Sequence, residues 1–98
     1  MLHILNKSPL EKSTLDTVLR LASSGALLLI EDAVYAATQG NAAEPRVREA
    51  MGRMPVYALM PDLQARGVAD RLINGVTPIE YEGFVDLVLE HPNCQSWL

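Results

Sequence analysis

The feature that most constrains the fold is an apolar segment that runs directly into two carboxylates. Gly25 opens the segment, residues 26–30 are all apolar, and Glu31 and Asp32 close it. An uninterrupted apolar run of this length is typical of a strand buried on both faces, and such strands belong to the centre of parallel sheets. We therefore expect residues 26–30 to form a central parallel strand, followed at once by a helix.

The two carboxylates after this strand have a functional and a structural interpretation. In open α/β sheets, ligands bind in the crevice outside the carboxyl ends of the strands, where Glu31 and Asp32 fall. A helix cap explains an acidic residue at a helix start without any ligand. We favour the cap, and expect Asp32 to accept a hydrogen bond from a free N–H of the first turn.

Composition limits the classes of protein. The 98 residues are 49% hydrophobic and only 20% charged, so we expect residues 1–98 to form a single domain, part of whose apolar surface meets another subunit. The net charge of −4 and the scattered basic residues argue against charge-driven binding of nucleic acid or of an anionic membrane. One cysteine allows no internal disulfide, and no apolar run reaches the ~20 residues of a membrane span. We expect a cytoplasmic location.

Strand and helix patterns alternate along the chain. Strands are expected at 1–5, 26–30, 56–60 and 76–81, with a short last strand within 93–98. Helices are expected from Ser8 to Ala22, after Asp32, from Pro45 to Met51, from Pro61 to Gly67 and up to His91. This order predicts a three-layer α/β sandwich, flavodoxin-like, around a mostly parallel sheet of about five strands.

The sequence of the first helix predicts its N-terminal cap, an ion pair on its surface and its buried face. Ser8, Pro9 and Glu11 fit a capping box at its start. Asp16 and Arg20 stand one turn apart and can form an ion pair. The expected buried face consists of Leu15, Val18, Leu19 and Ala22.

The C-terminal half carries further signals. Pro78 removes one ladder hydrogen bond from its strand, which favours an edge position. In the last helix, one stripe contains Phe84, Val88 and His91, with Leu87 beside it.

Cys94 is the one candidate nucleophile or sulfur carrier. A reactive thiol needs a helix N-terminus or nearby cations to lower its pKa, but Cys94 follows a helix end and its neighbours carry no charge. We favour a small, unreactive residue and keep a sulfur-handling thiol as the alternative. His91 and Cys94 form an H-x-x-C pair to which only His3 could be added, so we expect no metal site.

Other signatures of chemistry are missing. The sequence has no G-x-G-x-x-G, no G-x-x-x-x-G-K-[ST] and no G-x-S-x-G, and we expect no cofactor. Glu31, Asp32 and Asp62 could share one rim of the sheet, but no base, nucleophile or metal partner accompanies them. Two helix caps explain these carboxylates better than a reaction does.

Trp97 is the exception among the aromatic residues. A large ring at the penultimate position is exposed unless something covers it, and exposed aromatic rings are favoured interface anchors. Two interpretations stay open: Trp97 anchors another subunit, or it folds back on its own core. We expect His3 to be a hydrogen-bonded core or interface residue.

Several segments, taken together and in order, resemble the TusB family, also called the DsrH-like family. They are Met1-Leu2-His3 with Asn6-Lys7-Ser8-Pro9, Asp32-Ala33-Val34-Tyr35-Ala36-Ala37, Val56-Tyr57-Ala58-Leu59 with Asp62-Leu63 and Arg66-Gly67, Tyr81 with Phe84-Val85-Asp86-Leu87, and Gln95-Ser96-Trp97. The resemblance covers essentially the whole chain.

The resemblance implies a DsrE-like fold and a place in a cytoplasmic sulfur-relay hetero-hexamer with TusC-like and TusD-like siblings, each present twice. Such complexes pass persulfide sulfur toward 2-thiolation of the wobble uridine of tRNA. Their relay cysteine belongs to the TusD-like sibling, so this chain would be an accessory, non-catalytic subunit, able to form a homo-oligomer when isolated. The candidate interface or sheet-rim residues are Asp32, Tyr35, Asp62, Arg66 and Trp97.

Other functions stay open beside this one. Related DsrEFH complexes of sulfur oxidisers contain DsrH chains that can carry a cysteine in the first helix, at the position that Val18 takes here. This departure favours tRNA modification over a sulfur-trafficking role in sulfur oxidation. The remaining alternatives are a sulfurtransferase that uses Cys94 itself and a stand-alone flavodoxin-like ligand-binding module.

Overall fold

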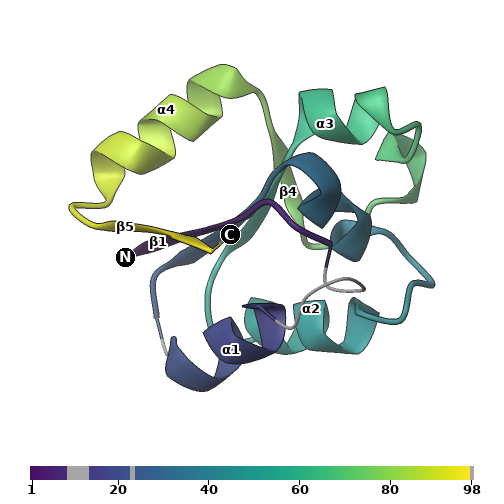
Figure 1. Ribbon diagram of the computed structural model, residues 1–98. Coiled ribbons are helices and arrows are strands. Elements are labelled where there is room, and N and C mark those ends of the chain that lie inside the picture. Colours follow the sequence, from purple (N-terminus) through teal and green to yellow (C-terminus); the bar gives the residue numbers. More distant parts are fainter. Residues whose placement is uncertain (9–13, 23, 98) are drawn as a thin grey trace.

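The computed structural model describes residues 1–8, 14–22 and 24–97, and a parallel sheet organises them (Figure 1). Its strands are β1 (Leu2–Leu5), β2 (Ala26–Leu29), β3 (Val56–Leu59), β4 (Thr77–Ile79) and β5 (Cys94–Trp97). They lie in the order β4-β3-β2-β1-β5, and all four pairings are parallel. The expected central strand is confirmed as β2. The edge position of the strand that contains Pro78 and the short last strand are confirmed as well.

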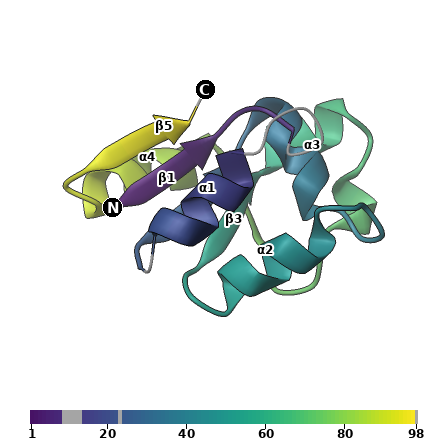
Figure 2. The same cartoon turned by 60° about the horizontal axis from the view of Figure 1, so that its bottom comes forward.

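The helices form the outer layers. They are α1 (Thr14–Leu21), η1 (Glu31–Ala37), α2 (Glu44–Met51), α3 (Met60–Ala65), η2 (Ala69–Arg71) and α4 (Tyr81–Glu90). Figures 1 and 2 show α1 and α2 side by side on one face of the sheet, with α4 on the opposite face. Right-handed crossovers explain this division, because the chain steps from β1 to β4 in one direction and then returns across the sheet to β5.

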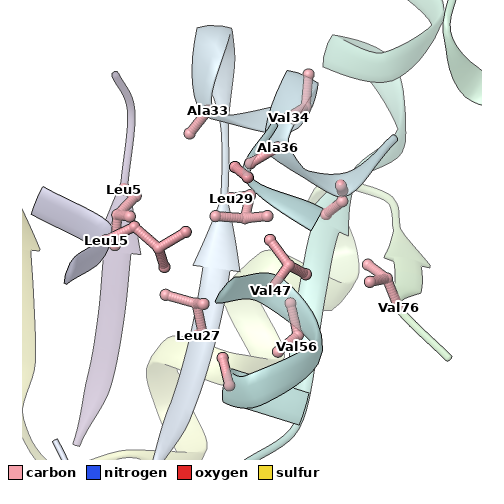
Figure 3. Close-up of a cluster of buried hydrophobic side chains, with 14 of the residues drawn as sticks. Leu5, Leu15, Leu27, Leu29, Ala33, Val34, Ala36, Val47, Val56 and Val76 are labelled. Carbon is pink, nitrogen blue, oxygen red and sulfur yellow. The ribbon is translucent and has the colours of Figure 1, made fainter. Parts of the chain in front are cut away.

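The larger core lies between the sheet and the helices α1 and α2. Figure 3 shows Leu27 and Leu29 of β2 beside Leu15 of α1 and Val47 of α2. The expected buried face of the first helix is confirmed, because its members are at most 7% exposed: Leu15, Val18, Leu19 and Ala22. The expected capping box at Pro9 and Glu11 lies outside the described residues.

A smaller core lies on the other face, under α4. Leu2, Ala26 and Leu28 are buried there against Leu87. Leu87, not Val88, is therefore the buried member of the last helix, because Val88 is 40% exposed. A helix about 10 Å wide cannot cover five strands spaced about 4.8 Å apart. The apolar residues at the margin are only partly buried: Ile4, Ile30, Tyr57, Ile79 and Phe84.

The helix expected after Asp32 is a 3₁₀ helix, η1. Ala33 donates its N–H to the carbonyl of Ile30, and Thr38 donates its N–H to the carbonyl of Tyr35, so both ends close with the three-residue spacing of this helix type. The Asn41 side chain then donates to the carbonyls of Ala36 and Thr38. These carbonyls are thereby satisfied without a further helical turn.

The expected ion pair of Asp16 with Arg20 is wrong. Asp16 pairs with Arg46 of α2 at 3.2 Å, while Arg20 bonds to the hydroxyl of Thr17. The pairing follows from packing, because α1 and α2 lie side by side and bring a cation of one helix to the carboxylate of the other. No helix in the described part of the chain is long and apolar enough to span a membrane.

Candidate functional site

The candidate site lies where β2 and β3 end. Leu29 of β2 is opposite Ala58 of β3, so η1 and α3 begin side by side at the carboxyl edge of the sheet. Four of the expected rim residues meet here, two from η1 and two from α3 or its end, and we call them the rim cluster: Asp32, Tyr35, Asp62 and Arg66. This is the edge at which α/β proteins of this type bind ligands.

Arg66 joins the two elements. Its Nε and Nη2 donate to Oδ1 of Asp32 at 3.0 and 2.9 Å. Its Nη1 donates to the backbone carbonyl of Asp62 at 3.3 Å and lies 3.8 Å from the carboxylate oxygen Oδ1 of that residue. The Arg66 side chain is only 22% exposed. The guanidinium is therefore held by both helices and is not a free anion site.

Asp62 shapes the start of η1. Its Oδ2 accepts the backbone N–H of Glu31 at 2.7 Å. Glu31 has a φ of +50°, a left-handed conformation that costs a side-chain-bearing residue free energy. The contact with Asp62 satisfies the N–H of this strained residue across 31 positions of sequence.

The expected capping role of Asp32 is wrong. The cap position of η1 is Ile30, whose own side chain makes no capping bond, and Asp32 is bonded to Arg66 instead. The carboxylate that satisfies a backbone N–H at this point comes from the neighbouring helix, and sequence reasoning missed that contact. One feature of the sequence could have indicated this contact. Asp32 and Asp62 take similar positions, each shortly after one of two strands that are neighbours in the sheet.

Tyr35 completes the rim cluster. The guanidinium carbon of Arg66 lies 6.0 Å from the centre of its ring, at the outer limit of a cation–π contact. The ring is 39% exposed. The rim cluster therefore presents an aromatic surface and carboxylate oxygens to the outside, but it contains no thiol.

Trp97 lies at the same edge of the sheet, two strands from β2. It is opposite Leu5 in the register of β5 and β1, is half-buried and packs against the larger core. Its indole Nε1–H donates to Nδ1 of His3 at 3.3 Å, with the ring centres 6.2 Å apart. Trp97 thus folds back on its own chain, and the structure does not bring it into the rim cluster.

His3 accepts this bond in its neutral form. A protonated imidazole carries a hydrogen on both nitrogens, so Nδ1 can accept only when His3 is uncharged. The His3 side chain is buried, with 6% exposure. Burial lowers the pKa of His3, and the positive charge of the N-terminus lowers it further. His3 is therefore a hydrogen-bonded buried residue.

Cys94 lies at the other end of the sheet. It is exposed and opposite Leu2, at the amino end of the parallel strands, whereas the rim cluster is at the carboxyl end. The length of a four-residue strand, about 10 Å, separates these two edges. Within the described ranges no three His, Cys, Asp or Glu side chains are placed to hold a metal ion.

Solved structures with the same architecture show the fold. The YchN protein of E. coli superimposes with a TM-score of 0.81 at 18% identity, covering 98% of this chain and 97% of that one. A protein of unknown function from Methanobacterium thermoautotrophicum gives a TM-score of 0.70, also at 18% identity, with 98% and 96% covered. At this identity the likeness establishes the architecture alone, and it confirms the expected α/β fold.

Comparison of sequences identifies the family. Protein TusB of Pectobacterium carotovorum is 41% identical over 98 residues, which is 99% of this chain and all of the relative. Protein TusB of E. coli is 42% identical over 100 residues, with the same coverage. The model of the family described as DsrH like protein matches residues 7–94. The chain belongs to the DsrH-like family.

Proposed function

We propose that this chain is an accessory, non-catalytic subunit of a TusBCD-type sulfurtransferase complex. The complex relays persulfide sulfur for 2-thiolation of the wobble uridine of tRNA. Its TusC-like and TusD-like siblings are the partners, and each chain is present twice in a cytoplasmic hetero-hexamer. Similarity to TusB proteins over the full length of both chains supports this proposal.

The position of Cys94 carries the non-catalytic part of the proposal. A relay thiol must be ionised, which requires a cation or a helix N-terminus close by. Cys94 is exposed on an edge strand, four residues after the C-terminal end of α4, so it does not lie at the N-terminus of that helix. The chain has no second cysteine. The thiol that carries the persulfide is therefore supplied by a sibling.

The valine at position 18 favours tRNA modification over the sulfur-oxidation alternative. Val18 occupies the first-helix position at which DsrH chains of sulfur oxidisers can carry a cysteine, and here it is fully buried in the larger core. Valine has no thiol and cannot carry sulfur. This chain therefore has no sulfur carrier in the first helix.

The rim cluster serves, in this proposal, as a contact for a sibling. Its guanidinium is already bound by carboxylate and backbone oxygens, so it does not polarise a substrate. Tyr35 is exposed at 39% and is an amphipathic ring of the kind that anchors protein interfaces. Trp97, also part-exposed, is proposed as a second contact at the same edge.

Replacing the thiol tests the proposal. The Cys94→Ser variant is assembled with both siblings, and transfer of labelled sulfur from a persulfide donor through the complex is measured. The neighbouring exposed substitution Gln95→Ala controls for disturbance of β5. We expect both variants to transfer sulfur at the wild-type rate. Loss of transfer in Cys94→Ser alone would make this chain a sulfur carrier and contradict the proposal.

A further inference from the structure

Exposed apolar side chains gather on one helix. Of the seven large hydrophobic side chains that are exposed in the described chain, four belong to the ten residues of α4. They are Tyr81 at 60%, Val85 at 56%, Val88 at 40% and Leu89 at 77% exposure. Isolated exposed apolar residues are ordinary on protein surfaces, but a group on one helix marks an interaction site.

The four side chains form one stripe. They are spaced four, seven and eight residues from Tyr81, which places them on one side of a helix with 3.6 residues per turn. Phe84 and Leu87 face the sheet instead. A Cβ on Gly83 would lie 2.9 Å from Cβ of Ile79, so the helix backbone packs directly on β4. This close contact fixes the rotation of α4 and leaves the apolar stripe outside.

A stripe of carboxylates borders the apolar stripe. Glu82, Asp86 and Glu90 follow one another at intervals of four residues and lie on the next sector of α4. Residues 80–90 contain four acids and no lysine or arginine. The whole chain has twelve acids and eight bases, so the remainder, with eight of each, is neutral. The net charge of −4 thus belongs to this segment alone.

These carboxylates have no internal partner in the described chain. Every ion pair found in the described ranges uses another acid, namely Asp16, Asp32, Glu44, Glu49 or Asp62. The four acids of residues 80–90 are therefore available to a cation from outside. We call the apolar and acidic stripes together the α4 surface: Tyr81, Glu82, Val85, Asp86, Val88, Leu89 and Glu90.

The charge of the α4 surface decides between possible occupants. Two copies of residues 80–90 would bring carboxylates to one interface without a lysine or arginine from either segment, which disfavours a homodimer there. An anionic membrane is repelled for the same reason. The complementary surface is apolar and edged by cations.

We propose that the α4 surface docks a different protein chain, whose apolar contact stripe is edged by lysine and arginine side chains. The inference rests on the proposed function in taking that chain to be another subunit of the relay complex. The apolar stripe supplies the buried area, and the acidic stripe sets the orientation and selects against wrong partners. The docking site lies on the opposite face of the sheet from α1 and α2.

Removing the apolar stripe tests the proposal. In the Val85→Ser/Leu89→Ser variant both changes are at exposed positions, so the fold is retained, which a thermal unfolding scan checks. Full burial of two such side chains on binding predicts a loss of affinity for the siblings of at least about tenfold. The matched control is Leu21→Ser, which removes a 72% exposed apolar side chain from α1 and is expected to bind normally. Equal binding by all three proteins would overturn the proposal.

Reversing the acidic stripe tests the chemistry of the partner. Glu82→Lys/Asp86→Lys should weaken binding strongly at low salt and less at high salt, because salt screens charges at the edge of an interface. Asp70→Lys makes the same kind of charge change at an exposed position outside the α4 surface and should have little effect. Unchanged or tighter binding by the double lysine variant would contradict a cation-edged partner.

The wild-type chain separates failure of the inference from failure of the proposed function. If the wild-type chain binds its siblings and the α4 variants bind equally well, the inference fails and the proposed function stands. If the wild-type chain binds neither sibling, both fail. If the wild-type chain forms a homo-oligomer that Val85→Ser/Leu89→Ser dissociates, the occupant is a second copy and the inference is wrong.

Discussion

At the scale of single residues, Glu31 is the most unusual position. It adopts a φ of +50° directly after the central strand, in a region that side chains other than glycine rarely occupy. Asp62 bonds to its N–H and compensates part of the cost. Neither fact is visible in the sequence, because Glu31 has no intrinsic preference for this conformation and Asp62 is far away along the chain.

Glycine should therefore be favourable at this position. The exposed side chain of Glu31 forms no ion pair within the described part of the chain, and its left-handed backbone would be free of strain in glycine. We predict that Glu31→Gly raises the free energy of unfolding by about 0.5–1 kcal/mol, as measured by urea titration. Glu49→Gly, at an exposed position inside α2, should lower it by about 1 kcal/mol. Destabilisation by both substitutions alike would contradict the strain at Glu31.

His3 makes the stability depend on pH. The folded state holds a neutral His3 with a lowered pKa, whereas in the unfolded chain the residue titrates near its ordinary pKa of 6.5. Below pH 6.5 the unfolded state therefore binds a proton that the folded state does not bind. It follows that the contribution of His3 is complete above pH 6.5 and is lost as the pH falls below that value.

Urea midpoints between pH 8 and about pH 5 check this prediction. The wild-type midpoint should fall on acidification, and His3→Gln should show a flatter profile. The pKa of Glu44 is lowered, first by the Gly40 N–H and then by Arg48, so the contribution of Glu44 is complete above pH 4.5 and is lost only below that value, outside this range. A wild-type profile in His3→Gln would show that another group is responsible.

At the scale of elements, the strands and most helices could be predicted because their signals are local. The apolar run of β2, the proline in β4 and the buried stripe of α1 each follow from a few neighbouring residues. The 3₁₀ form of η1 could not be predicted in this way. The N–H of Glu31 at its start donates to Asp62, and the carbonyl of Ala36 near its end accepts from the Asn41 side chain. Both partners lie outside the element.

The hydrogen bonds by which Arg66 connects η1 and α3 give a prediction at this scale. Arg66→Ala removes the bonds to Asp32 and to the Asp62 carbonyl, breaks this connection between η1 and α3, and leaves a part-buried carbonyl without this donor. We predict a loss of about 1–2 kcal/mol of unfolding free energy, measured by urea titration. Arg48→Ala breaks an exposed pair within α2 and should cost at most about 0.5 kcal/mol. Equal losses would mean that Arg66 is an ordinary surface residue.

At the scale of the whole molecule, the order of elements predicts the three layers, but not how completely each face is covered. The return of the chain from β4 to β5 places α4 on the opposite face, and only the packed structure shows that α4 leaves residues such as Tyr57 and Ile79 part-buried. The candidate site is similar in this respect. The sequence predicts that Asp32 and Asp62 share a rim, whereas the contacts of Arg66 depend on the folded chain.

In the proposed function, the molecule is one part of a larger assembly. It has a charged helix whose acids lack partners in the described chain, and its one thiol lies away from the rim cluster. A sheet with an incompletely covered face and an exposed apolar helix is stable alone only to a limited extent. Assembly with siblings would cover this surface and supply the missing thiol.

The decisive measurement is the native mass of the chain, alone and co-expressed with its TusC-like and TusD-like siblings. A subunit of the relay complex should form one complex that contains all three chains in equal numbers, each present twice. A chain that ignores both siblings and stays a monomer or a homo-oligomer would contradict the proposed function.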